Sequence, residues 1–181
     1  MSSFVAIDFE TANHDRDSAC AVGLAAGQGG RIVRAQSFLI RPPSPEFVFT
    51  GIHGLRWEDV CDAPTFGELW PSLLAWIDNV EFIAAHNAPF DQSVLQACCA
   101  TYGIPVPRKP FTCTVELARA QWGIYPTKLS DVCRQLRIPL RHHDSGSDAK
   151  ACARIVLAAE ANGWHRNRWR RRRQSHAPGV T

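Results

Sequence analysis

The segment VAIDFETA, residues 5–12, places two carboxylates inside a stretch that otherwise suits a buried strand. Apolar side chains alternate there with smaller or polar ones, which is the period of a β-strand. Asp8 and Glu10 would therefore project from the same face, about 7 Å apart along the strand. Like charges repel, and burying carboxylates without a partner is costly. We expect a positive group to neutralise them.

Two further acids repeat this pattern on helices. Asp91 shares a helical face with the apolar residues at positions 94, 95, 98 and 102, and Asp148 shares one with positions 152, 155 and 159. Both acids are therefore expected to point inward. A single acid in the first turn of a helix also complements the helix dipole, and Ser145 with Asp148 fits a capping box. Capping alone remains an alternative for each acid taken singly.

Four converging carboxylates suit divalent metal ions, since Mg²⁺ and Mn²⁺ prefer oxygen ligands. Two such ions about 4 Å apart can activate water and stabilise the leaving oxygen in phosphodiester hydrolysis. A base is also needed, and His143 precedes Asp148 by five residues. On one continuous helix this spacing turns the two side chains about 140° apart. His143 can act as the base if it lies on the loop before the helix; an unengaged surface histidine is the alternative.

Three blocks of this sequence resemble the DEDDh 3′→5′ exonucleases: DFET at 8–11, HNAPFD at 86–91 and HHDSGSD at 142–148. That family includes the proofreading epsilon subunit of bacterial DNA polymerase III, ribonuclease T and oligoribonuclease. The resemblance spans about residues 3–161. It implies a ribonuclease H-like fold, two Mg²⁺ or Mn²⁺ ions and the release of 5′-mononucleotides from a 3′ end. It also implies five catalytic residues, of which His143 is the general base and the others are the metal ligands: Asp8, Glu10, Asp91 and Asp148.

The same resemblance implies contacts with the substrate. Thr11 would lie beside the terminal nucleotide, and the HNAPFD block would approach the terminal sugar and base. The GIHGL segment resembles a loop that places apolar side chains, here Ile52 and Leu55, against the last bases. The implied substrate-binding residues are Thr11, Ile52, His86, Asn87 and Phe90.

The elements that must position these residues follow from local patterns. β-like segments at 18–27 and 31–40, joined by the turn GQGG, predict an antiparallel meander with the first strand. Residues 51–60 are expected to form a loop and a short helical turn. Strands and helices then alternate, which predicts an α/β domain with a mixed sheet flanked by helices. The expected later elements are helix 65–79, strand 81–85, the helix that begins near Asp91, a strand-to-helix segment at 110–121, and helices at 128–138 and 146–161.

The 181 residues, 45% of them hydrophobic, can form one well-packed domain, which we place at 1–163. The net charge of +3 is unevenly distributed. Six of the 20 basic residues and no acids lie in 164–181, so the rest of the chain has 14 basic against 17 acidic residues. This basic tail is expected to be flexible and to suit polyanions, with Trp164 and Trp169 able to stack on bases. A solvated tail without a specific role is the alternative.

The seven cysteines include no CxxC pair. The sequence has no apolar run that approaches the roughly 18 to 20 residues of a membrane-spanning helix, and its N-terminus lacks the pattern of a secretion signal. This pattern favours reduced cysteines in a cytoplasmic protein without a membrane segment. The expected function is metal-dependent exonuclease activity on DNA or RNA with a 3′ end, single-stranded by preference. Alternatives are a non-catalytic nucleic-acid-binding module on the same fold and a zinc or redox protein. Sugar preference, oligomeric state and any polymerase partner remain open.

Overall fold

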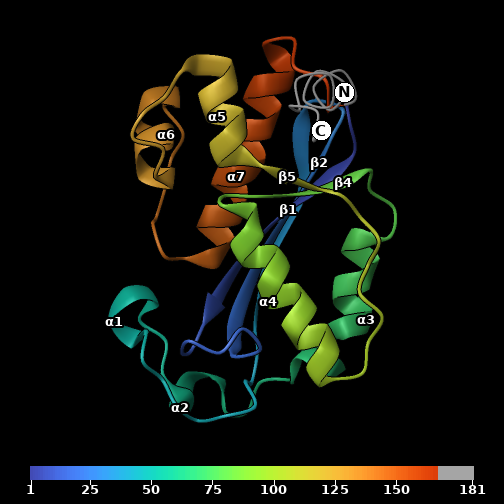
Figure 1. Ribbon diagram of the computed structural model, residues 1–181, viewed down its shortest axis with the longest axis vertical. Coiled ribbons are helices and arrows are strands. Elements are labelled where there is room, and N and C mark those ends of the chain that lie inside the picture. Colours follow the sequence, from blue (N-terminus) through green and yellow to red (C-terminus); the bar gives the residue numbers. More distant parts are fainter. Residues whose placement is uncertain (167–181) are drawn as a thin grey trace, which may run out of the picture.

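A five-stranded mixed sheet forms the centre of the protein in the computed structural model, which describes residues 1–166 (Figure 1). The strand order is β3-β2-β1-β4-β5. Strands β1, β2 and β3 pair in antiparallel fashion, whereas β4 and β5 run parallel to β1. The mixed sheet and its opening meander confirm the sequence prediction. The strands are β1 (Phe4–Thr11), β2 (Ala19–Gln28), β3 (Arg31–Leu39), β4 (Phe82–Ala85) and β5 (Phe111–Cys113).

Helices cover both faces of this sheet (Figure 1). The expected short turn within 51–60 consists of two four-residue helices, and the other predicted helices are present with small shifts of their ends. The capping box of Thr65 with Glu68 begins the third helix. The helices are α1 (Thr50–His53), α2 (Trp57–Val60), α3 (Phe66–Ile77), α4 (Ala88–Thr101), α5 (Thr114–Trp122), α6 (Leu129–Leu136) and α7 (Ser145–Ala161).

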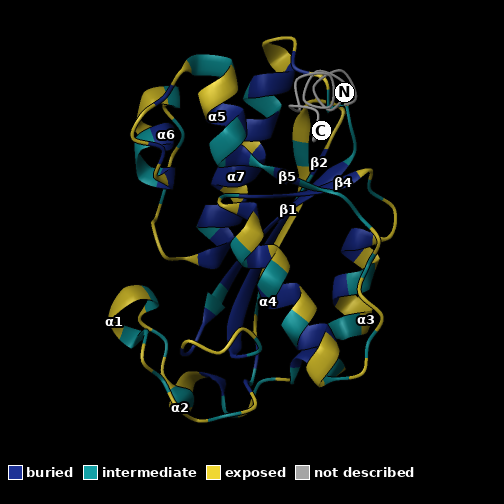
Figure 2. Cartoon of the chain, in the orientation of Figure 1, coloured by how far each residue is buried: buried dark blue, intermediate teal, exposed yellow. Residues whose placement is uncertain are grey.

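Alternation along β1 divides the core into two layers. Phe4 and Ala6 pack with α5, α6 and α7, whereas Val5, Ile7 and Phe9 pack with α3 and α4 on the other face. The central strand β1 and its neighbours β2 and β4 are largely buried, whereas β3 at the sheet edge is mostly exposed (Figure 2). Because side chains alternate along a strand, the even-numbered acids of β1 fall on the α7 face of the sheet.

The start of α7 lies very close to the sheet at Gly23. An added Cβ at Gly23 would lie 1.9 Å from the backbone oxygen of Ser145. Gly23 is also the residue paired with Asp8 across the β1–β2 ladder. The missing side chain therefore lets the first turn of α7, which carries Asp148, approach the strand that carries Asp8.

The prediction that Trp164 in the tail can stack on bases is wrong. Trp164 is 3% exposed and its ring packs edge-on against Phe82, with 6.2 Å between the centroids. It is part of the core and not available to stack on bases, because its indole fills space beside β4 that α7 leaves uncovered. Trp169 and the rest of the basic segment at 167–181 lie outside the described residues.

Within residues 1–166, no helix is both long enough and apolar enough to cross a membrane. All seven cysteines are free thiols.

Candidate active site

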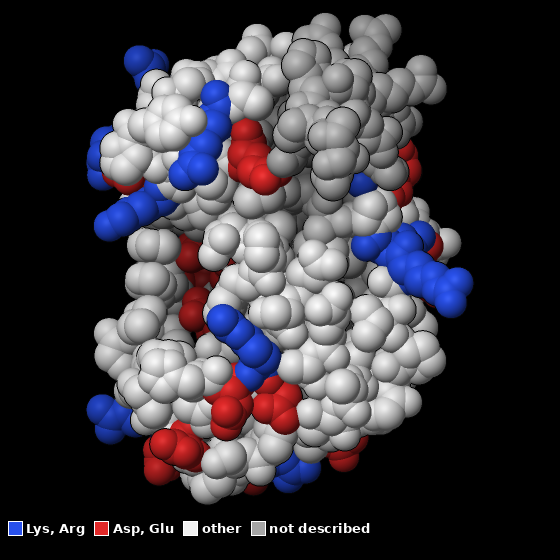
Figure 3. All heavy atoms as spheres, in the orientation of Figure 1, with Lys and Arg blue, Asp and Glu red and all other residues white. Residues whose placement is uncertain are grey.

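A cavity of about 460 Å³ opens at the end of β1 and collects most of the predicted site residues. Figure 3 shows acidic side chains lying inside the hollow on the left of the molecule, between the region of α6 and α7 and the region of α1. The lining comes from the end of β1, the α1 segment, the starts of α4 and α6, and the turn before α7. Its residues are Asp8, Phe9, Glu10, Thr11, Phe49, Ile52, His53, His86, Phe90, Lys128, Leu129, His142, His143 and Asp148.

Three carboxylates line this cavity, and a fourth, Asp91, lies close enough to Asp8 to act on its charge. Asp8 and Glu10 come from β1, and Asp148 comes from the first turn of α7. Asp91, in the first turn of α4, accepts a hydrogen bond from the backbone N–H of Phe9 at 3.0 Å. Asp91 is 2% exposed and Asp148 is 4% exposed. The inward orientation predicted for both helical acids is therefore confirmed.

The electrostatics of the four acids show their crowding. Burial, and then the charges of Asp91 and Asp148, raise the pKa of Asp8 well above its usual value. Burial and the same two acids raise the pKa of Glu10 to about 8. Burial also raises the pKa of Asp91 to about 7. Within the described residues, no lysine or arginine forms a salt bridge with any of the four acids. In this part of the chain the charge of the cluster is therefore not compensated by a lysine or arginine, and His142 is the side chain that pairs with one of its members, Asp148.

These residues fit divalent cations. The donor set is made of carboxylate oxygens, the ligand type that Mg²⁺ and Mn²⁺ prefer. The buried Oδ1 atom of Asp148 has no hydrogen-bond partner among the described residues, whereas its Oδ2 atom accepts two hydrogen bonds. A buried carboxylate oxygen without a donor is costly. A bound cation would remove this cost and the mutual repulsion of the acids.

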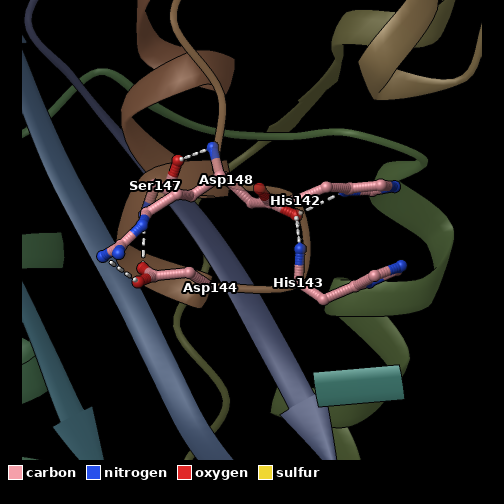
Figure 4. A network of polar contacts seen from close by, with 6 residues as sticks. His142, His143, Asp144, Ser147 and Asp148 are labelled. Atoms are coloured by element: carbon pink, nitrogen blue, oxygen red, sulfur yellow. Dashed lines mark hydrogen bonds and ion pairs between the residues drawn. The ribbon is translucent and has the colours of Figure 1, made fainter. Parts of the chain in front are cut away.

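The turn before α7 carries His143 to the cavity (Figure 4). Asp144 caps the helix by accepting a hydrogen bond from the N–H of Ser147, so the predicted capping box of Ser145 with Asp148 is wrong. His143 has a φ of 65°, a left-handed conformation that is uncommon outside glycine. The helix thus begins after His143 and leaves its side chain free to lie beside Asp148, as the loop position required.

His142 is a neighbour of the site that the sequence analysis missed. Its Nδ1 donates to Asp148 Oδ2 at 3.1 Å, and its ring stacks on the ring of His143 with 3.9 Å between centroids. The backbone N–H of His143 donates to the same oxygen at 3.2 Å. One ligand atom from each of these three residues lies within 4.8 Å of the others. The paired histidines in the sequence were the available signal.

His53 fastens the α1 segment over the end of β1. Its Nε2–H donates to the carbonyl of Thr11 at 3.2 Å, so its Nδ1 accepts the 3.1 Å hydrogen bond from the N–H of Leu55. Burial, and to a lesser extent the nearby His143, lower the pKa of His53. A neutral ring therefore holds the loop that presents Ile52, which is 51% exposed. The GIHGL motif was noted for Ile52, but His53 was missed.

The remaining predicted contacts divide into two groups. Thr11, Ile52 and Phe90 line the cavity, as does His86. Both ring nitrogens of His86 are engaged, since Nε2 donates to the carbonyl of Thr127 at 3.0 Å and Nδ1 lies 2.9 Å from the hydroxyl of Thr114. Burial lowers the pKa of His86 to about 4, so this ring is neutral.

Asn87 is not brought to this cavity. It adopts a left-handed φ of 64° at the start of α4 and lines a different cavity beside Glu116 and Arg119. Asn87 is the N-cap residue of α4, and Pro89 follows in the first turn, a position that suits proline. The placement of Asn87 near the terminal nucleotide, which the resemblance implied, has no support in this geometry. Phe49 and Lys128, by contrast, line the main cavity without having been predicted.

Comparison with known proteins agrees with this geometry. The family model of the RNase T exonucleases matches residues 5–156. A search of curated proteins found no match. Among solved structures, Exonuclease X in complex with 5′ overhanging duplex DNA is similar, with 23% identity, a TM-score of 0.74, and coverage of 91% of this chain and 95% of that chain.

Two other solved structures have the same fold at lower identity. The nuclease domain of 3′hExo, a DEDDh family member bound to rAMP, has 15% identity and a TM-score of 0.76, and the match covers 90% of this chain and 93% of that one. E. coli Exonuclease I in complex with a dT13 oligonucleotide has 14% identity and a TM-score of 0.74, covering 90% of this chain and 42% of that one. These similarities establish the ribonuclease H-like exonuclease fold, and the family generally uses divalent metals.

Proposed function

This chain belongs to the RNase T family of exonucleases, and we propose that it hydrolyses phosphodiester bonds one at a time from the 3′ end of nucleic acid, releasing 5′-mononucleotides. The observation that carries the proposal is a cluster of acids without a lysine or arginine partner among the described residues: Asp8, Glu10 and Asp148 line one cavity, and Asp91 lies beside Asp8. Bound cations would relieve the repulsion within such a cluster, and it lies where a chain end can enter.

The four acids would hold two divalent ions, Mg²⁺ or Mn²⁺. When bound, these ions supply charge neutralisation of the scissile phosphate and a lower pKa for the attacking water. The chain itself supplies the rest. Asp8 and Glu10 are fixed by the sheet, Asp91 by its hydrogen bond to β1, and Asp148 by its hydrogen bonds to the turn before α7. This fixed geometry orients the phosphodiester before reaction.

His143 is the proposed general base. Its ring borders the same cavity as Asp8 and Glu10. Desolvation and the neighbouring His142 lower the pKa of its imidazole, so the ring is neutral and can accept a proton at physiological pH. It would take a proton from the attacking water, whose oxygen bonds to phosphorus while the bond to the 3′ oxygen breaks. His142 stacks behind it and keeps its ring in place.

The mouth of the cavity suits a nucleotide at a chain end. Phe49, Ile52 and Phe90 offer apolar and aromatic contacts for a base, and Thr11 offers a hydroxyl beside them. We assign these residues to the binding of the terminal nucleotide. The proposed substrate is single-stranded DNA or RNA, because its 3′ end is unpaired and can reach them. The cysteine content supports a cytoplasmic location, because all seven thiols are free.

The test is degradation of DNA and RNA oligonucleotides of one sequence, single-stranded and duplex, labelled at either end. A 5′ label should yield a ladder that shortens with time, and a 3′ label should appear at once as a mononucleotide. The reaction should need Mg²⁺ or Mn²⁺ and stop with chelator. Release of mononucleotides from the 5′ end, or full activity in chelator, contradicts the proposal. Binding without cleavage under all conditions would instead support a non-catalytic module.

A further inference from the structure

A groove on the far side of the turn before α7 carries an excess of positive charge. It has a volume of about 330 Å³, and Leu140, Arg141, Asp144, Ser147, Lys150 and Arg154 are among its lining residues. We call it the α7 groove. Three cationic side chains meet a single carboxylate there. Of these three cations in the described part of the chain, Arg141 alone pairs with that carboxylate, with 4.0 Å between its Nη1 and Asp144 Oδ2.

The three cations are exposed, and Arg141 is the one that pairs with Asp144. Lys150 and Arg154 are exposed, and within residues 1–166 neither forms a salt bridge or a hydrogen bond with another side chain. They are four residues apart on α7, so they lie on the same face of the helix about 6 Å apart at Cβ. The side chain of Arg141 is 84% exposed. The groove therefore presents a row of cations to solvent.

A second cavity lies between the groove and the candidate active site. It has a volume of about 270 Å³ and lies against the end of β3 and the start of α7. It shares Glu10, His53 and His143 with the active-site cavity, and it shares Asp144 with the α7 groove. Figure 4 shows the same division, with the two histidines on one side of the turn and Asp144 and Ser147 on the other.

The charge distribution makes such a surface necessary. Among its described lining residues, the active-site cavity has three acids and, as the single lysine or arginine, Lys128, and Asp91 lies close behind Asp8. A polyanion is repelled by such a floor until cations occupy it, so attraction must come from outside the cavity. On the face shown in Figure 3, Lys and Arg side chains lie over the region of α5 and α6, above the acidic hollow.

We propose that the α7 groove binds the sugar–phosphate backbone of the substrate at positions remote from its 3′ end, with Arg141, Lys150 and Arg154 contacting phosphates. The inference rests on the proposed function, since it extends the substrate path from the site assigned above. The strand leaves the active-site cavity, follows the cavity beside β3 and reaches the groove. Contacts with phosphates carry no base sequence, so this surface adds affinity for longer substrates and not sequence preference.

The test compares the double variant Lys150→Ala/Arg154→Ala with a matched control, Arg31→Ala/Arg108→Ala. Both control arginines are exposed and line none of the three cavities on the path, and Arg31 lies at the end of β3 opposite to Leu39. Alanine suits the helical positions, so α7 should be retained. Two 5′-labelled single strands are used, of about 3 and about 20 nucleotides, so that one is shorter and the other longer than the proposed path. Their binding is measured by fluorescence anisotropy between about 50 and 200 mM KCl.

For the long strand, losing two phosphate contacts should reduce the slope of log affinity against log salt by about 1.4, since each contact on a single strand contributes about 0.7. The slope for the short strand and the slopes of the control variant should not change. An unchanged slope for the long strand overturns the inference and would direct attention to an acidic protein partner. Equal losses on both strands also overturn it, because they indicate damage to the active site.

Hydrolysis separates this inference from the proposed function. We compare kcat/KM on the long strand with kcat/KM on a nucleoside 5′-monophosphate aryl ester, which needs only the active site. The ratio of the first to the second should fall in the groove variant. If the unmodified protein releases no nucleotides from any oligonucleotide, the proposed function has failed. If it does release them while the groove variant keeps both its ratio and its salt slope, only the groove assignment has failed.

Discussion

At the scale of single residues, the site is defined by carboxylates that repel one another. Burial raises the pKa values of Asp8, Glu10 and Asp91, and the charges of Asp91 and Asp148 raise those of Asp8 and Glu10 further. A backbone hydrogen bond from Phe9 holds Asp91 beside β1. A fold tolerates this arrangement when a ligand relieves it. Together with their convergence at one end of β1, the raised pKa values support the proposal that these acids bind cations.

Asp8→Asn should abolish nucleotide release while leaving the fold intact. The amide has nearly the same shape but removes a negative charge and a carboxylate ligand from the centre of the cluster. Release of mononucleotides in Mn²⁺ is the measurement, with circular dichroism as the control for folding. Activity equal to that of the unmodified protein would refute the assignment of the metal ligands.

His143→Ala should slow hydrolysis by about 10²- to 10⁴-fold, which is the usual contribution of a general base. The matched control is His142→Ala, since His142 stacks on His143 and contacts Asp148 but is not proposed to accept the proton. Its loss should be smaller. Initial rates at saturating Mn²⁺ decide between the two histidines, and a larger loss for His142→Ala would reverse their roles.

At the scale of elements, the site depends on how closely α7 approaches the sheet. Gly23 in β2 faces the backbone of Ser145 at the first residue of α7, and Gly146 lies against the hydroxyl of Ser37. These contacts bring the first turn of the helix, with Asp148, to the end of β1. On the opposite side of the cavity, His53 holds the α1 segment to β1 through its hydrogen bond to the Thr11 carbonyl, and its Nδ1 accepts a second one from Leu55 in its own segment.

Gly23→Ala should destabilise the protein by about 1–3 kcal/mol, the usual cost of overpacking. The added methyl group would meet the Ser145 carbonyl and force α7 away from β1. For a chain of this size, thermal unfolding should occur about 2–4 °C lower for each kcal/mol. Gly51→Ala is the control, because no atom lies within 4 Å of its added Cβ. An unchanged midpoint for Gly23→Ala would contradict the close approach.

At the scale of the whole molecule, acidic and basic side chains gather in different places. The acidic cavity lies in a domain whose free cations border the α7 groove, and the most basic segment of the chain follows the last described residue. Stability, metal binding and nucleic-acid binding should therefore all respond to pH or salt.

Without metal, the protein should lose stability as pH rises from about 4 to about 8. The folded-state pKa values of Glu10 (about 8) and Asp91 (about 7) lie above those of the unfolded chain, so the folded state binds more protons in this window. The stabilisation is fully present below the unfolded pKa values and is lost as pH passes through the folded ones. Thermal unfolding in chelator across this range is the measurement.

Two controls accompany this pH profile. Asp8→Asn should show a shallower loss, because one member of the cluster no longer ionises. Addition of Mn²⁺ should raise the unfolding temperature most at high pH, where the acids are ionised. A metal-free protein whose stability rises steadily between pH 4 and 8 would contradict the cluster.

Removing residues 167–181 should preserve the unfolding temperature and weaken nucleic-acid binding, because the segment holds five arginines. Each arginine that contacts a phosphate contributes about 0.7 to the salt slope on a single strand. Truncation after Ala161 should instead destabilise the fold by about 3–5 kcal/mol, since it removes the core residue Trp164. Thermal unfolding and salt-dependent binding distinguish the two truncations. An unchanged salt slope in the shorter deletion would assign the tail no role in binding.

The sequence by itself determined the chemistry and the order of elements. The alternation around Asp8 and Glu10, and the helical spacing that includes Asp91 and Asp148, are local patterns. They could predict inward acids because side-chain direction follows from the period of a strand or a helix. Likewise, the meander and the later alternation of strands and helices predicted the mixed sheet.

Only the tertiary structure decided which residues meet. It removed Asn87 from the cavity through a left-handed backbone turn, placed Trp164 in the core, and brought His53 and His142 beside the acids. These outcomes depend on contacts between segments far apart in the chain, such as the 82-residue separation joined by the Phe9–Asp91 hydrogen bond. Local periodicity contains no information on such distances, because packing between elements sets them.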